Sequence, residues 1–160
     1  MASKIMTAEQ ARAFRDRLQA AGQRLAFTNG CFDILHRGHV SYLQFARAQA
    51  DALCVGLNSD RSVKRNKGEK RPLNSEEDRA FVLAALAAVD CVVLFDEDEP
   101  RDLITRIHPD VLIKGRDWAH YVSGRDIVEA YGGKVVLADL VEGRSTTGII
   151  EKVLQAYGNK

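Results

Sequence analysis

The chain has 160 residues with a formal net charge of +1; 46% of the residues are hydrophobic and 28% are charged. This composition is ordinary for a soluble globular protein, and we expect one domain over residues 1–160. The balanced charge gives no reason to expect a nucleic acid or an anionic membrane as partner, and no apolar run approaches a membrane span. Three cysteines without paired spacing, and no signal-peptide core, predict a cytoplasmic protein.

The predicted elements begin with a helix and then alternate between strands and helices. A capping-box pattern at Thr7 and Gln10 predicts a helix over residues 7–21, so residues 1–22 form an N-terminal helical extension. Apolar runs predict strands at 25–28, 53–57, 91–95, 111–113 and 135–138. Helical periodicity predicts helices at 38–50, 75–88, 99–107, 123–131 and 146–157. This alternation predicts an α/β fold with a doubly wound, five-stranded parallel sheet.

The most informative segment lies where the first strand gives way to a helix. It contains GCFD at residues 30–33 and HRGH at residues 36–39. Ligands of parallel sheets bind at the C-terminal ends of strands, and a helix N-terminus favours an anion. Imidazoles can donate hydrogen bonds to a phosphate, so the segment predicts a nucleotide or phosphate site. A zinc site from Cys31, His36 and His39 is an alternative, but it lacks a fourth ligand and the usual paired spacing.

Two further segments carry chemistry suited to phosphate. Ser145, Thr146 and Thr147 open the last predicted helix, where hydroxyls and N–H groups either cap the helix or cradle a phosphate. Residues 58–71 break the alternation and hold six Lys and Arg against two acidic residues. We expect a loop there, which is either a solvated basic surface or a mobile arm that folds over a polyphosphate.

The two motifs together resemble the nucleotidyltransferase superfamily that is defined by its HxGH motif. The chain lacks the GxGxxG dinucleotide pattern and the P-loop pattern, so the phosphate must be held differently. Within that superfamily the chain is most similar to the bacterial heptose 1-phosphate adenylyltransferases, over about residues 24–154. The segments that support this similarity are 58–60, 71–74, 76–79, 89–90, 109–112 and 114–115.

The resemblance implies a Rossmann-like nucleotidyltransferase fold and a specific reaction. AMP would pass from ATP, with Mg²⁺, to D-glycero-D-manno-heptose 1-phosphate, giving pyrophosphate and ADP-heptose for lipopolysaccharide or other surface polysaccharide. It also implies a homo-oligomer, and we expect a stand-alone enzyme supplied by a separate kinase. Alternatives are a transferase that uses CTP or glycerol 3-phosphate, and a nucleotide-binding regulatory module. Leu140 replaces an arginine of the related cytidylyltransferases, which favours an adenine nucleotide.

The resemblance also assigns catalytic roles. We expect His36 and His39 to contact the triphosphate, with His39 stabilising charge on the α-phosphate. Lys70 matches the superfamily lysine that reaches the phosphates from the mobile arm, and Lys67 is a nearby competitor. Because the attacking phosphate is already ionised, no general base is needed.

Two charged residues have alternative interpretations. We expect Asp33 to orient a histidine or to take part in Mg²⁺ binding through the phosphates, the alternative being a cap or turn carboxylate. The resemblance suggests that Arg79 faces the site, the alternative being a pair with Glu76 or Ser75 on its own helix.

The remaining expected nucleotide-binding residues lie at strand ends and helix starts. They are Thr28, Asn29, Gly30, Cys31, Phe32, Gly38, Lys114, Gly115, Asp117, Arg144, Ser145, Thr146 and Thr147. Cys31 and Phe32 are interpreted as packing residues of this segment. Gly30 is expected to let the nucleotide lie against the backbone. Asp117 resembles the family carboxylate near the ribose or base, and Arg144 is expected to add charge at the β- and γ-phosphates.

Overall fold

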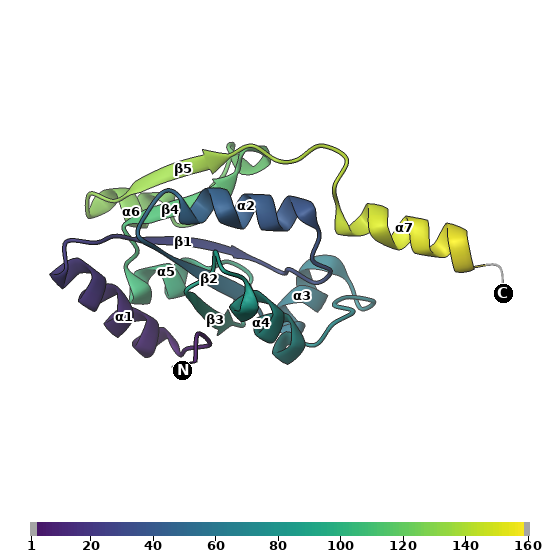
Figure 1. Cartoon of the computed structure of the whole chain (residues 1–160), viewed down its shortest axis with the longest axis horizontal. Helices are drawn as coiled ribbons and strands as arrows, with labels where there is room; N and C mark the ends of the chain where they lie inside the picture. Colours follow the sequence, from purple (N-terminus) through teal and green to yellow (C-terminus); the bar gives the residue numbers. More distant parts are fainter. Residues whose placement is uncertain (1–2, 159–160) are drawn as a thin grey trace.

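The computed structural model describes residues 3–158, which are built around a five-stranded sheet (Figure 1). The strands are β1 (Leu25–Gly30), β2 (Ala52–Asn58), β3 (Cys91–Phe95), β4 (Val111–Gly115) and β5 (Lys134–Ala138). Their order across the sheet is β3-β2-β1-β4-β5, and every neighbouring pair is parallel. The predicted doubly wound sheet is confirmed. The order reverses between β1 and β4, so their C-terminal ends form the switch point where such sheets bind ligands.

Helices cover both faces of the sheet (Figure 1). They are α1 (Ala8–Ala20), α2 (Arg37–Arg47), α3 (Asp60–Lys67), α4 (Glu76–Ala85), α5 (Arg101–Ile107), α6 (Arg125–Ala130) and α7 (Thr146–Tyr157). One hydrophobic core packs α1, α5 and α6 against one face, and a second packs α2 and α4 against the other. The faces divide because side chains alternate along a strand: Leu25 and Phe27 of β1 enter the first core and Ala26 enters the second.

The N-terminal segment is integrated into this fold. The predicted capping box of Thr7 and Gln10 is present at the start of α1. Ala8 and Ala11 of α1 are buried in the first core, and Met6 donates its backbone N–H to the Val92 carbonyl of β3 at 2.9 Å. The segment expected as an extension therefore covers the sheet and part of its edge.

The prediction of a loop over residues 58–71 is wrong for its first half. The Ser59 hydroxyl accepts a hydrogen bond from the Ser62 N–H and caps α3, and Val63 is fully buried beneath the charged residues. Hydrophobic periodicity did not predict this helix, because Val63 is its one apolar residue and six basic residues lie in the same segment 58–71. Residues 68–75 do form turns and bends without regular structure.

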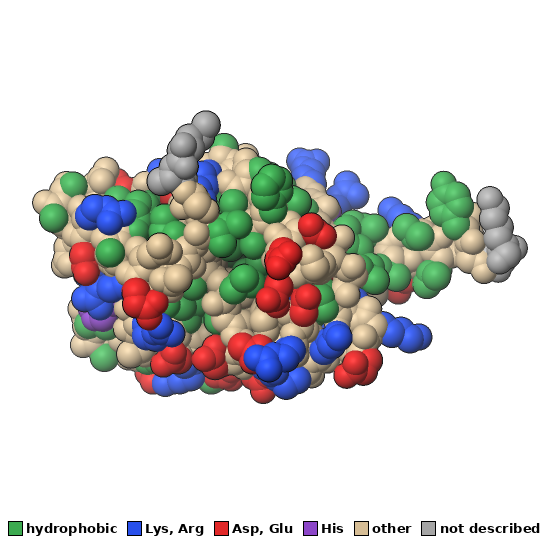
Figure 2. Space-filling view, turned by 90° about the horizontal axis from the view of Figure 1, so that it is seen from below, with side chains coloured by type: hydrophobic (Ala, Val, Ile, Leu, Met, Phe, Trp, Pro, Cys, Tyr) green, Lys and Arg blue, Asp and Glu red, His purple; other side chains and the backbone are tan. Residues whose placement is uncertain are grey.

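Helix α7 projects away from the body of the protein (Figure 1). None of its residues is buried, although Ile149, Ile150, Val153, Leu154 and Tyr157 share one face of the helix. The exposed fractions of the last three side chains range from 52% to 68%, and Figure 2 shows hydrophobic side chains along the projection. Within residues 3–158 we find no helix with the length and apolarity that crossing a membrane requires.

Candidate active site

The two histidines of the first motif meet at the start of α2, just beyond the end of β1. His36 is the N-cap residue, and its Nδ1 accepts a hydrogen bond from the Gly38 N–H at 3.1 Å. Nε2 of a neutral His36 therefore carries the proton and can donate to a phosphate. The His36 and His39 rings stack with centroids 3.9 Å apart, and the Phe32 ring lies edge-on to His39 at 5.4 Å. The expected grouping of both histidines at one point is present.

Both imidazoles are poised in the neutral form. Burial, with a smaller contribution from the neighbouring charge of His36, lowers the pKa of His39 to about 4. Burial and the nearby Arg144 also lower the pKa of His36. The Nδ1 atom of His39 is buried and has no hydrogen-bond partner among the described residues. A ligand could use this atom, but Arg15 Nε and His108 Nδ1 outside the site are unpaired in the same way, and the Ile34 backbone lies close to the His39 ring.

The second motif lies against the first, although more than 100 residues separate them in the sequence. The Ser145 hydroxyl caps α7 by accepting from the Gly148 N–H at 3.0 Å. The Thr146 hydroxyl lies 3.5 Å from the carbonyl oxygen of Ile34 in the loop before α2. A side chain at Gly38 would meet the Arg144 Cβ at 3.2 Å, so this glycine allows the two segments to touch. Thr147 and Arg144 themselves are exposed.

The start of the first motif is more closely packed than expected. A Cβ atom on Gly30 would lie 2.9 Å from the Phe32 ring, and Phe32 adopts a left-handed φ of 45°. Gly30 thus makes room for the buried Phe32 ring, and the expected approach of a nucleotide to its backbone stays a prediction. Phe32 is buried and Cys31 is partly buried, in line with their interpretation as packing residues.

Asp33 fixes the segment that follows α3. Its buried carboxylate accepts from Arg71 Nε at 2.6 Å and from the backbone N–H groups of Leu73 and Asn74 at 2.9 Å. Burial alone would raise the pKa of Asp33, but these N–H groups and the guanidinium together hold it below its usual value. Asn74 Nδ2 also donates to the Asp33 carbonyl at 2.6 Å. Neither expected role, orienting a histidine or binding Mg²⁺, fits a carboxylate whose oxygens are both occupied; the turn-carboxylate alternative is correct.

Arg79 connects three segments instead of facing the site. It is 2% exposed, and it donates to the carbonyls of Cys31 at 2.7 Å and Asn74 at 3.1 Å. It also pairs with the Asp60 carboxylate at 2.8 Å. The expectation that Arg79 faces the site is wrong because its guanidinium is consumed inside the protein. The alternative of a side-chain pair with Glu76 or Ser75 on the same helix is absent too; the Glu76 carboxylate accepts from the Asp60 N–H at 2.7 Å, and the Ser75 hydroxyl accepts from the Asp78 N–H at 3.2 Å.

The two candidate lysines of the arm are both exposed. Among the described residues 3–158, the side chains of Lys67 and Lys70 make no hydrogen bond and no ion pair. Burial raises the pKa of the Cys31 thiol, and the positive charge of Lys67 opposes this shift, so Lys67 lies near the first motif. Lys70 directly precedes Arg71, which Asp33 holds in place. The geometry leaves both lysines as candidates to reach a phosphate.

The C-terminal end of β4 supplies a third group of polar residues. Lys114 Nζ donates to Asn29 Oδ1 at the end of β1 at 3.0 Å and lies 5.7 Å from the centroid of the Trp118 ring. A side chain at Gly115 would collide with the Asp117 carboxylate. Burial lowers the pKa of Lys114, and the charge of Asp117 opposes that shift. These residues therefore meet at the switch point.

Thr28 does not belong to the surface of the site. It is fully buried, and its hydroxyl lies 2.7 Å from the hydroxyl of Tyr42. Tyr42 also donates to the Ile113 carbonyl at 3.3 Å, which links α2 to β4. The expected role of Thr28 in binding the nucleotide is therefore not open to its side chain. Tyr42, Arg71 and Asn74 support the site and were missed, because nothing in their local sequence indicates such distant partners.

The described residues do not form a metal site of their own. Within residues 3–158, no group of three or more His, Cys, Asp or Glu side chains is arranged to hold a metal ion. The Asp33 carboxylate already accepts hydrogen bonds from three groups, so it is not a free ligand for Mg²⁺.

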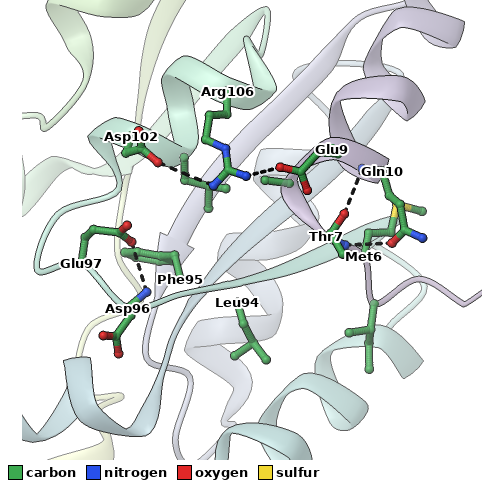
Figure 3. Close-up of a pocket in the computed structure, with 13 residues that line it drawn as sticks. Met6, Thr7, Glu9, Gln10, Leu94, Phe95, Asp96, Glu97, Asp102 and Arg106 are labelled. Atoms are coloured by element: carbon green, nitrogen blue, oxygen red, sulfur yellow. Dashed lines mark hydrogen bonds and ion pairs between the residues drawn. The ribbon is translucent and has the colours of Figure 1, made fainter.

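A hollow of about 560 Å³ lies away from these motifs (Figure 3). It is next to the edge strand β3, between residues 5–10 and residues 94–97. The Arg106 guanidinium inside it is paired with Glu9 and, at 3.7 Å, with Asp102. Because its cation is satisfied within the protein, the hollow is a weaker candidate than the switch point.

Comparisons with known proteins agree with this geometry. The chain is 58% identical to bifunctional protein HldE of Geobacter sulfurreducens over 143 residues, which are 89% of this chain and 29% of that protein. It is 54% identical to bifunctional protein HldE of Syntrophotalea carbinolica, over 97% of this chain and 32% of that protein. The chain thus spans about a third or less of these relatives.

Solved structures share the fold. The lipopolysaccharide core biosynthesis protein from Thermoplasma volcanium matches 77% of this chain and 100% of its own, with a TM-score of 0.62 and 27% identity. Pantoate-beta-alanine ligase from Francisella tularensis matches 96% of this chain and 80% of its own, with a TM-score of 0.61; at 16% identity it shows the fold alone. The cytidylyltransferase-like family model matches residues 27–152, from the middle of β1 into α7. The predicted resemblance is therefore confirmed, and the chain belongs to the cytidylyltransferase-like family of nucleotidyltransferases.

Proposed function

We propose that this protein transfers AMP from ATP to D-glycero-D-manno-heptose 1-phosphate, giving ADP-heptose and pyrophosphate. The observation that carries the proposal is the contact between the HRGH motif and the Ser145 turn at the switch point of the sheet. The 58% identity to a bifunctional HldE protein and the likeness to a lipopolysaccharide core biosynthesis protein support this acceptor. ADP-heptose would then feed lipopolysaccharide or other surface polysaccharide.

The reaction asks for positioning and charge stabilisation. An ionised oxygen of the acceptor phosphate attacks the α-phosphorus, a new P–O–P bond forms, and the bond to pyrophosphate breaks. The proton on Nε2 of His36 and the neutral ring of His39 provide hydrogen bonds to the triphosphate. The N-terminus of α7, with Ser145 and Thr147, adds N–H and hydroxyl donors. Mg²⁺ would arrive with ATP and offset phosphate charge.

The basic arm, residues 58–71, supplies a lysine to the triphosphate. Lys70 follows α3 in a segment that Asp33 anchors to the first motif, so its ammonium can approach the triphosphate without the segment detaching. Lys67 at the end of α3 is the competing candidate for this role. Arg144 adds positive charge beside His36.

A cytoplasmic homo-oligomer is the proposed setting. Cys31, Cys54 and Cys91 are all free thiols, as a reducing compartment requires. The apolar face of α7 supports self-association, since 12-residue helices are marginal in water without tertiary packing.

Release of pyrophosphate tests the proposal directly. The purified protein is given MgATP or MgCTP with each anomer of heptose 1-phosphate, other sugar 1-phosphates or glycerol 3-phosphate. We expect release only with ATP and a heptose 1-phosphate. Release with CTP and glycerol 3-phosphate would replace the proposed substrates, and tight ATP binding without release from any pair would indicate a regulatory module.

A further inference from the structure

Lys114 is a partly buried cation without an ion pair among the described residues, although the carboxylate of Asp117 lies near enough to act on its charge. The buried arginines Arg15 and Arg79 pair with Asp110 at 2.7 Å and with Asp60 at 2.8 Å, and the partly buried Arg71 pairs with Asp33 at 2.6 Å. Lys114 makes no ion pair within 4 Å to any residue of the described range 3–158, and its one hydrogen bond goes to the neutral amide of Asn29. A partly desolvated charge of this kind is stabilised when a ligand supplies the counter-charge.

The position of Lys114 indicates where that ligand binds. It lies near the end of β4, and its partner Asn29 lies near the end of β1, so the ammonium spans the point where the strand order reverses. This is where parallel sheets of this kind bind ligands. Two of the three N–H donors of the ammonium remain for an anion.

The neighbouring aromatic residue indicates what the ligand carries besides charge. The Trp118 ring lies 5.7 Å from Lys114 Nζ, and its side chain is 48% exposed. An exposed ring beside a cation offers a ligand an apolar face next to a positive charge. The apolar C–H face of a sugar suits such a ring, while the ammonium suits a phosphate on the same molecule.

We propose that Lys114, Asn29 and Trp118 form the subsite for the acceptor, a sugar phosphate. The Lys114 ammonium pairs with the acceptor phosphate, and the Trp118 ring packs against the sugar. In the proposed function the triphosphate already receives hydrogen bonds and positive charge from the histidines, the start of α7 and the basic arm, so it does not need this cation. This assignment moves Lys114 from the nucleotide side, where the resemblance had put it, to the acceptor side. The inference rests on the proposed function and names its acceptor site.

The test separates acceptor binding from nucleotide binding. Lys114→Met keeps the length of the side chain and removes the charge; Lys134→Met, at the exposed start of β5, is the matched control. We expect the KM for heptose 1-phosphate to rise by about 10- to 100-fold in Lys114→Met, the scale of a lost charged hydrogen bond. The Kd of a non-hydrolysable ATP analogue, measured by calorimetry without acceptor, should change less than about twofold. Lys114→Arg should restore part of the affinity.

Equal weakening of the analogue and the acceptor would put Lys114 in the nucleotide site and overturn the inference, as would an unchanged acceptor KM. Should Lys114→Met fail to fold, Trp118→Ala provides the same test, because its exposed ring adds little to the core. In that variant the affinity for the sugar phosphate should fall more than the affinity for inorganic phosphate. Failure of the proposed function is distinguishable: a wild-type protein without transfer activity that still binds a sugar phosphate through Lys114 would retain the inference.

Discussion

The two halves of the candidate site are held in different ways. The first motif is held by buried side chains. Asp33 connects the loop before α2 to residues 71–74, and Arg79 connects it to α3. The second motif touches the body through Thr146 at 3.5 Å, and no residue of α7 is buried. One half is preorganised by the fold, whereas the other half is free to be ordered by a ligand or by a partner chain.

The largest expected effect on stability comes from removing the negative charge of Asp33, which holds the first motif in place. Asp33→Asn leaves Arg71 and two N–H groups facing an amide, so we expect a loss of about 3–5 kcal/mol in the free energy of unfolding. Urea denaturation followed by circular dichroism measures it. Asp16→Asn is the control, because Asp16 is exposed, pairs with Arg12 at 2.9 Å and approaches Arg15 only to 3.7 Å, so the change should cost less than about 1 kcal/mol. Similar losses of unfolding free energy in both variants would mean that Asp33 does not hold the first motif in place.

The same carboxylate should shape the stability at acid pH. Because the pKa of Asp33 is depressed in the folded protein, its contribution is complete above the ordinary value of 3.8 and is lost as the pH falls below it. The wild-type protein should therefore lose stability more steeply below pH 3.8 than Asp33→Asn does. Parallel acid profiles of the two proteins would contradict this assignment.

Removing a histidine should affect turnover and leave the fold intact. His39→Ala deletes a ring at the start of α2 that is only partly buried, so the cores remain. We expect a loss of about 10²-fold or more in kcat, as for other donors that stabilise transition-state charge. Pyrophosphate release gives kcat, and thermal unfolding checks the fold. Near-normal turnover in a folded variant would remove His39 from the mechanism.

A smaller effect is expected from the arm. Lys70→Ala should lower kcat/KM about tenfold, the scale of one charged contact to a phosphate. Lys64→Ala removes an equal charge from α3 and should change it less than about twofold. Lys67→Ala decides between the two candidates, since Lys67 lies near Cys31. Equal losses in all three variants would mean that the arm acts only as a diffuse positive field.

The sequence predicted the parts of this comparison that depend on local patterns. Apolar runs placed all five strands, and Ser145 indicated the start of α7, because capping and periodicity are properties of neighbouring residues. The partners of Asp33 lie 38 to 41 residues away in the chain, so no local pattern contains them. Helix α3 was missed because one buried valine among the four basic residues of that helix gives almost no periodic pattern. The exposure of α7 could not be predicted either, because a helix packed in the core would show the same apolar face.

The smallest effect tests the other half of the site. Leu154 in α7 is 62% exposed, whereas Leu83 in α4 is fully buried. Leu83→Ala should cost about 2–5 kcal/mol of unfolding free energy, and Leu154→Ala less than about 0.5 kcal/mol when measured at high dilution. If the cost of Leu154→Ala instead grows with protein concentration, α7 packs against a second copy. In that case contact with a second copy of the chain holds the Ser145 turn in place. The first motif is then ordered by its own chain and the second motif by a partner chain.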